Sequence, residues 1–170
     1  TACLKGEVGY NFFTEQDDRS HKAIAKLRSI FKDDFYLEIQ DNGLPEQKIV
    51  NEKVIAYAKE NDIQLLATND CHYMTSEDAT AQEVLLCVQT GKTFADENRM
   101  KMTSREFYFK PASKMREAFA HVPEACDNSL RIADKCNVEL NWKDENGNQI
   151  YHLPDFPIGT GETPDDYFNR

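Results

Sequence analysis

Two short apolar runs separated by one amphipathic stretch constrain the fold of this chain more than any other feature. Residues 35–39 alternate apolar side chains with polar or amphipathic ones, and residues 64–68 form a second apolar run, so each run predicts a strand. Between them, Asp41-Asn42-Gly43 predicts a turn, and Pro45 suits the first turn of a helix. A strand, a helix and a strand joined by short links are typical of a parallel α/β unit.

Further helices are predicted on both sides of this unit. Asp17 or Asp18 can cap a helix before the first strand. After the second strand, residues 75–78 resemble a capping box, and Gly91 is placed to close the helix that follows. The apolar positions expected on these two helices are Ile24, Leu27, Ile30 and Phe31 on the first, and Val84, Leu85 and Val88 on the second.

The last third of the chain predicts less regular structure. Residues 107–109 are typical of a short strand, and Ser113 and Pro123 are suited to open two helices. Asn146-Gly147 predicts a turn. From Leu153 the chain is rich in Pro, Gly and acidic residues, which is typical of an extended linker.

Composition limits the function classes. The 170 residues leave room for one domain with a sizeable core, and the formal net charge of −10 opposes binding to nucleic acid by bulk electrostatics. The five Cys include no CxxC pair, which argues against a disulfide framework or a zinc ribbon and favours a reducing, cytoplasmic setting. No apolar run is long enough to predict a membrane span, and because the chain does not begin with Met we expect a fragment of a longer protein.

The segment 67–73 carries the strongest candidate chemistry. Asp70 and His72 follow the second predicted strand, and residues two apart on an extended backbone point the same way. A carboxylate and an imidazole aimed at one point form half of a site for a divalent metal. Active sites of parallel α/β folds gather at this end of the strands. The pair therefore predicts a metal site, with a satisfied polar loop as the alternative.

Glu38 and Asn69 are candidates for a supporting role. Glu38 shares one face of the first predicted strand with Tyr36 and Gln40. If that face lines an interior, a buried Glu needs hydrogen-bonding partners, and it can support a metal site by holding the ligands in place without binding the metal itself. The alternative is a Glu exposed at a sheet edge.

Several segments together resemble the later part of the polymerase-and-histidinol-phosphatase (PHP) domain of bacterial DNA polymerase III alpha subunits. The resemblance covers essentially the whole chain, in the same order and with similar spacing. The segments that carry it are residues 3–8 (CLKGEV), 35–47 (FYLEIQDNGLPEQ), 67–73 (ATNDCHY), 85–98 (LLCVQTGKTFADEN), 98–101 (NRMK), 107–110 (FYFK) and 152–157 (HLPDFP).

This resemblance implies an α/β fold, namely part of a distorted parallel (βα) barrel of the PHP type with a C-terminal helical extension. Residues 1–105 would hold the later strands and helices of the barrel, and residues 106–150 the helical extension. Residues 151–170 would form the extended linker towards the palm domain.

The resemblance also implies site residues. Asp70 and His72 match an Asp-x-His motif that supplies two metal ligands, and they are the expected catalytic residues. Cys3 matches an earlier ligand that is His in some members and Cys in others. The family's first ligands, including a His-x-His pair, have no counterpart in this chain. We therefore expect zinc, manganese or magnesium in the parent protein and a partial site or none in the fragment.

The function implied for the parent is DNA replication by a DNA-directed DNA polymerase, a nucleotidyltransferase. Its PHP domain would be a metal-dependent phosphoesterase acting as a 3′–5′ exonuclease, in contact with DNA and other replicase subunits in the cytoplasm. The isolated fragment is expected to be inactive. The alternative is a non-catalytic structural module that braces the palm and contacts partner subunits. Strands expected around Cys3, Leu37 and Leu66 would lack upstream neighbours, which favours a homodimer of the fragment. The alternative is a compact monomer in which residues 1–10 fold across the gap and pack against the sheet.

Overall fold

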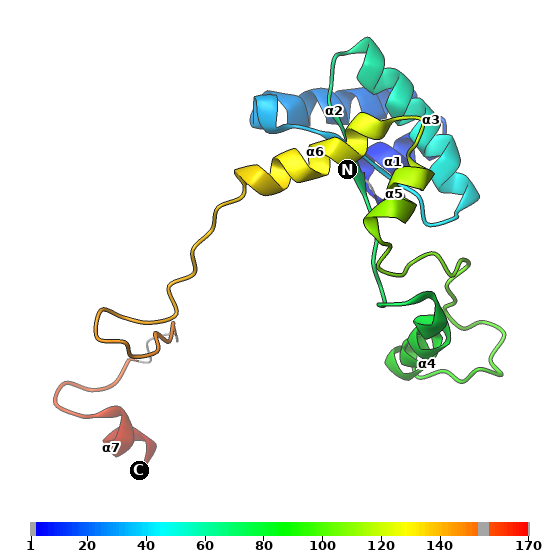
Figure 1. The fold of residues 1–170 in the computed structure, drawn as a ribbon. Coiled ribbons are helices and arrows are strands. Elements are labelled where there is room, and N and C mark those ends of the chain that lie inside the picture. The colour runs from blue at the N-terminus through cyan, green and yellow to red at the C-terminus, as the bar shows by residue number, and fades with distance from the viewer. Residues whose placement is uncertain (1–2, 153–156, 170) are drawn as a thin grey trace. The chain divides into compact units, whose positions relative to one another are not determined.

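The computed structural model describes residues 3–152 and 157–169. The chain divides into two units, Thr1–Cys136 and Asn137–Arg170, which are described separately below. Figure 1 follows the chain through the seven α-helices and two strands of the described residues. The border predicted at residue 105 lies inside the first unit.

A parallel pair of strands forms the centre of the first unit. Strand β1 (Leu37–Gln40) pairs with β2 (Leu65–Thr68), with Leu37 opposite Leu65 and Gln40 opposite Thr68. Helix α3 (Pro45–Glu60) connects them, and Pro45 lies in its first turn. The predicted parallel α/β unit is confirmed, and within the described residues the sheet contains these two strands only.

One face of the sheet is buried under helices. The side chains of Leu37, Ile39, Leu65 and Ala67 alternate with half-buried neighbours along the strands, as the period of two requires. Burial of an aliphatic side chain of this size stabilises the fold by roughly 1.5–3 kcal/mol. Helices α1 (Glu7–Phe13), α2 (Asp17–Phe31), α3 and α6 (Pro123–Lys135) supply most of the rest of this core (Figure 1), and Phe35, Phe119 and Val122 add to it from connecting segments. Their core residues are Val8, Phe12, Ala23, Ile24, Val50, Val54, Ala58, Ala125 and Cys126.

Helix α1 replaces the strand that was expected around Cys3. Among the described residues Cys3 is exposed and precedes a turn, and its main-chain oxygen accepts a hydrogen bond from the Gly6 N–H at 2.7 Å. A Cβ on Gly9 would lie 2.9 Å from the same oxygen. The small residue therefore lets the incoming chain cross the helix closely.

Helix α2 follows its predicted apolar face for only part of its length. Ile24 is buried and Leu27 packs at the edge of the core, whereas Ile30 and Phe31 are exposed. The expectation for the last two residues was wrong, because the whole final turn of α2 is exposed to solvent. The 3₁₀ turn η1 (Lys32–Asp34) then leads into β1.

The predicted ends of helix α4 (Ala79–Thr90) are confirmed, but the prediction of its buried face is wrong. Thr75 and Asp78 form the capping box over the 3₁₀ turn η2 (Ser76–Asp78), and Gly91 ends the helix with φ +62°. Leu86 and Cys87 are buried. The expected core positions Val84, Leu85 and Val88 are instead exposed.

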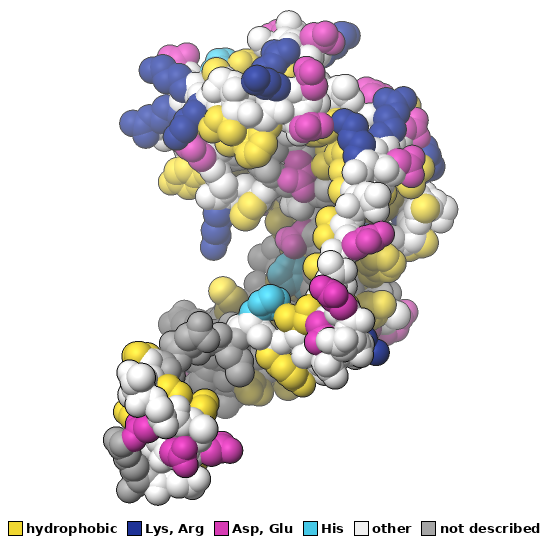
Figure 2. Space-filling model, turned by 90° about the vertical axis from the view of Figure 1, so that its left-hand side faces the viewer, with side chains coloured by type: hydrophobic (Ala, Val, Ile, Leu, Met, Phe, Trp, Pro, Cys, Tyr) yellow, Lys and Arg dark blue, Asp and Glu magenta, His cyan; other side chains and the backbone are white. Residues whose placement is uncertain are grey.

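The segment after α4 explains which face of this helix is covered. Arg99 makes an ion pair with Glu83 at 2.7 Å and lies 4.6 Å from the centre of the Phe94 ring. The segment after α4 therefore folds back onto the side of the helix that carries Glu83, while Val84, Leu85 and Val88 face solvent. Figure 2 shows hydrophobic side chains interspersed among charged ones on the face that it presents.

The predicted strand at residues 107–109 is reduced to a single parallel bridge between Tyr73 and Tyr108. Phe107 is buried, so the apolar pattern reflects burial without an extended ladder. Helix α5 (Ala112–Ala118) begins within one residue of the predicted Ser113, and α6 begins at the predicted Pro123.

The second unit has little regular structure in its described residues. The turn at Gly147, with φ +83°, lies inside an antiparallel bridge between Lys143 and Gln149. Residues 153–156 of the predicted linker lie outside the described residues. A wholly extended linker is wrong, because α7 (Pro164–Phe168) forms where Thr163 and Asp166 make a capping box. Across the described residues, every helix is too short or too polar to cross a membrane.

Candidate functional site

The loop after β2 brings Asp70 and His72 together, as their spacing predicts. The Nε2 atom of His72 lies 3.1 Å from Oδ1 of Asp70, and the two side chains remain 38% and 45% exposed. The ring of Phe107 meets the imidazole edge-on, with 5.4 Å between ring centres. The pair therefore faces solvent at the carboxyl end of a parallel strand, with one side of the imidazole supported by an aromatic ring.

Glu38 belongs to a hydrogen-bonded row on the half-buried face of the sheet. Its Oε1 atom accepts a hydrogen bond from the Thr68 hydroxyl at 2.5 Å, and the Gln40 side chain donates to the same hydroxyl oxygen at 3.2 Å. Thr68 lies two residues before Asp70, so this polar face leads towards the candidate loop. Glu38 is half-buried on a strand that has one neighbour in the described sheet, and its supporting role for a metal stays a prediction.

Asn69 ties the candidate loop to the segment before α5. Its side-chain amide donates to the main-chain oxygen of Tyr108 at 2.8 Å. The N–H of His72 donates to the main-chain oxygen of Phe107 at 2.7 Å. Asn69 thus holds the loop to this segment through a main-chain oxygen, and its supporting role for a metal stays a prediction.

Sequence reasoning missed Asn42, which it read only as a turn residue. Asn42 is fully buried, and its amide donates to the main-chain oxygens of Asp70 at 3.2 Å and Glu106 at 3.0 Å. These partners are 28 and 64 residues away along the chain. A turn motif carries no sign of such long-range acceptors, so no local pattern could have identified this residue.

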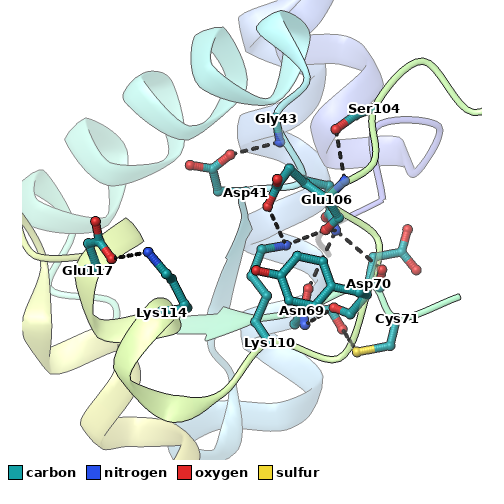
Figure 3. Close-up of polar contacts among 12 residues, drawn as sticks. Asp41, Gly43, Asn69, Asp70, Cys71, Ser104, Glu106, Lys110, Lys114 and Glu117 are labelled. Carbon is teal, nitrogen blue, oxygen red and sulfur yellow. Dashed lines mark hydrogen bonds and ion pairs between the residues drawn. The ribbon is translucent and has the colours of Figure 1, made fainter. Parts of the chain in front are cut away.

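Next to the candidate loop, residues of the turn after β1 and the segment before α5 line a cavity of about 430 Å³. The Lys110 side chain is only 6% exposed, and its ammonium group lies 3.6 Å from the Glu106 carboxylate and 4.8 Å from the centre of the Tyr108 ring. Figure 3 shows Lys110 and Glu106 beside Asn69 and Asp70.

The second lysine of this cavity is also paired. Lys114 donates to Glu117 at 2.8 Å; this hydrogen bond raises the pKa of Lys114 and lowers that of Glu117. Both groups therefore stay charged at neutral pH. Because Lys110 and Lys114 both have carboxylate partners, this cavity is not a strong anion site by itself.

Cys3 is not brought into a three-residue cluster with Asp70 and His72. In the part of the chain that the structure describes, no group of three or more His, Cys, Asp or Glu side chains is arranged to hold a metal ion. Cys71, between the pair, is exposed and its thiol points back to the main-chain oxygen of Asn69 at 3.4 Å (Figure 3). The donor types of Asp70 and His72 fit a divalent ion such as zinc or manganese, but they supply only part of a donor set. The Cys3 ligand stays a prediction.

Comparison with known proteins gives one consistent result. The chain is 41% identical over 158 residues to the DNA polymerase III subunit alpha of Helicobacter pylori, a match that covers 87% of this chain. It is 40% identical over 166 residues to that of Deinococcus radiodurans, covering 96% of this chain, and 37% identical over 176 residues to that of Thermus aquaticus, covering 100%. No family model matches the chain.

The matches cover nearly all of this chain but little of each relative. The chain spans 13% of the Helicobacter pylori protein, 12% of the Deinococcus radiodurans protein and 14% of the Thermus aquaticus protein. The chain is therefore a homologue of one segment of bacterial DNA polymerase III alpha subunits.

Proposed function

We propose that the chain is part of the PHP domain of a DNA polymerase III alpha subunit, and that Asp70 and His72 contribute to a divalent-metal site of a phosphoesterase. In the parent protein this site would remove 3′ nucleotides as an exonuclease attached to DNA synthesis. DNA and other replicase subunits would then be the partners of the parent. Cys3 and ligands from other parts of the parent would complete the donor set.

The observation that carries this proposal is the Asp70–His72 pair itself. Its two side chains meet at 3.1 Å beyond the carboxyl end of β2, in a loop fastened to two other segments. A solvated polar loop needs neither this convergence nor buried amide supports. The chain's surface charge of −10 gives no general attraction for DNA, so a local cation would have to attract the phosphodiester.

The residues of this chain would have distinct roles. Asp70 supplies a carboxylate oxygen and His72 an imidazole nitrogen, while Phe107 limits rotation of the imidazole from the side. Divalent ions bound at such a site supply charge neutralisation for a scissile phosphate and activation of the attacking water. Glu38 would hold the polar sheet face through Thr68 without binding the ion.

The test is substitution in the full-length subunit. Asp70→Ala and His72→Ala should each lower bound zinc or manganese, measured by elemental analysis, and abolish release of mismatched 3′ nucleotides. DNA synthesis by the same preparations should persist and serves as the folding control. Cys71→Ala is the matched variant, because its exposed side chain lies between the two residues and points to Asn69. Undiminished nucleotide release by His72→Ala would refute the catalytic assignment.

The 170-residue chain alone should release no nucleotides, because its donor set is partial.

A structural role without catalysis is the second candidate, and exposed apolar side chains on α4 favour it. Leu85 is 62% and Val88 is 74% exposed, on a helix whose other side is covered. A module that contacts other parts of the replicase, or a second copy of the chain, would cover these side chains. If this second candidate is right, light scattering gives a mass above the 19.6 kDa of one chain. A lower apparent mass for Leu85→Glu would support burial of α4 in the association, and a wild-type monomer would count against the homodimer.

A further inference from the structure

We propose that Asn42 is a positioning residue: its buried amide fixes the loop that presents Asp70 and His72. The inference rests on the proposed function for what this pair binds, but not for how the pair is held. Asn42 follows β1, whereas the residues that it would position follow β2.

The Asn42 amide lies at the meeting point of three segments. Its two N–H bonds face the main-chain oxygens of Asp70 at 3.2 Å and Glu106 at 3.0 Å, with Oδ1 of Asn69 at 3.5 Å. The side chain has no exposed surface. Lys110 is a second donor to the Glu106 oxygen, so the Asn42 amide restricts the loop chiefly through its bond to the Asp70 oxygen.

Gln47 fixes the orientation of this amide. The Asn42 N–H donates to Oε1 of Gln47 at 2.7 Å, and Nε2 of Gln47 donates to Oδ1 of Asn42 at 3.3 Å. The oxygen of the Asn42 amide is thereby turned towards α3, and its NH₂ group towards the candidate loop. Gln47 is itself 5% exposed, so water cannot readily replace either bond.

The connection from Asn42 reaches both members of the pair. At Asp70 it acts directly, through the main-chain oxygen. At His72 it acts through one neighbour, because Asn42 holds the oxygen of Glu106 and the next residue, Phe107, accepts the His72 N–H at 2.7 Å. Ligand constellations need side chains held within about 0.5 Å by such supporting bonds.

Asn128 offers a matched control at the opposite end of β2. It is 3% exposed, and its amide donates to the main-chain oxygen of Leu65 at 2.7 Å. Asn42 and Asn128 therefore combine the same residue type with similar burial and the same kind of acceptor. They differ in which end of the strand they hold.

The experiment measures amide hydrogen exchange by NMR in the 170-residue chain. Asn42→Ala should speed exchange of the His72 amide at least tenfold relative to core amides such as Ile39. Asn128→Ala should not raise the ratio of the His72 exchange rate to the Ile39 exchange rate, because it loosens the core without freeing the loop. If Asn42→Ala does not fold, Gln47→Ala provides the milder test, because it frees the Asn42 amide to rotate. An unchanged His72-to-Ile39 ratio in the folded Asn42 or Gln47 variant would overturn the positioning role.

A manganese titration of the same samples separates this inference from the proposed function. Paramagnetic broadening detects weak binding, and in the wild-type chain it should select the Asp70 and His72 amides. Asn42→Ala should raise the manganese concentration that broadens these two amides by about 10–100-fold. This is the usual effect of losing a hydrogen bond that orients a metal ligand. Asn128→Ala should not raise it. If the wild-type chain shows no selective broadening while the exchange ratio still responds to Asn42, the metal assignment fails and the positioning role stands.

Discussion

The side-chain amide of Asn128 donates a hydrogen bond to the main-chain oxygen of Leu65 at 2.7 Å, across 63 residues of sequence. This contact fastens α6 to the first residue of β2, so a helix from the last part of the first unit completes the cover of the sheet.

Loss of this contact should destabilise the first unit. Asn128→Ala leaves a buried main-chain oxygen without this donor, and we expect the free energy of unfolding to fall by about 1–3 kcal/mol. Urea unfolding followed by circular dichroism measures the change. Asn169→Ala is the control, since its amide makes an exposed bond within one helical turn, to Asp165. An equal loss of stability in both variants would contradict the importance assigned to the buried bond.

Two neighbouring leucines of α4 should respond in opposite ways to truncation. Leu86 is 8% exposed, and Leu86→Ala should lower the stability of the α4 region by about 2 kcal/mol through lost burial and the cavity left behind. Leu85 is 62% exposed, and Leu85→Ala should change the stability of the α4 region by less than about 0.5 kcal/mol. Hydrogen exchange of α4 amides measures both effects. A larger effect at Leu85 would show that its face is covered in solution.

The cap of α7 should depend on pH through Asp166. The hydroxyl and the N–H of Thr163 donate to its carboxylate, at 2.6 and 3.1 Å, and these bonds lower the pKa of Asp166. A lowered pKa means that the cap contributes stability above the ordinary aspartate value of about 3.9, and that this contribution is lost as pH falls through the lowered value.

The Thr163 amide proton reports on this cap directly. Its NMR chemical shift should stay constant at neutral pH and titrate below about pH 3.9. Asp166→Asn should remove that titration, because the ionisable partner is gone. A titration that persists in Asp166→Asn would assign the pH dependence to another group.

The local elements and the residue types of the candidate loop follow from the sequence alone. Alternating apolar residues and Pro45 were sufficient to predict β1, α3 and β2, because the period of two in a strand and the start of a helix both depend on neighbouring residues only. Asp70 and His72 converge for the same reason, since two residues separated by one on an extended backbone point the same way. The resemblance to DNA polymerase III alpha subunits is likewise carried by sequence and agrees with relatives that are 37–41% identical.

Which apolar helix faces are buried, and which contacts hold the loop of Asp70 and His72, depends on tertiary packing. Val84 and Leu85 carry the pattern of a buried helix face, yet they are exposed, and Arg99 folds back onto Glu83 of the same helix. Asn42 reads as a turn residue, yet its amide binds main-chain oxygens 28 and 64 residues away. Such acceptors are main-chain atoms, which every residue carries, so no sequence pattern distinguishes them. Their position depends on how separate segments pack around the sheet.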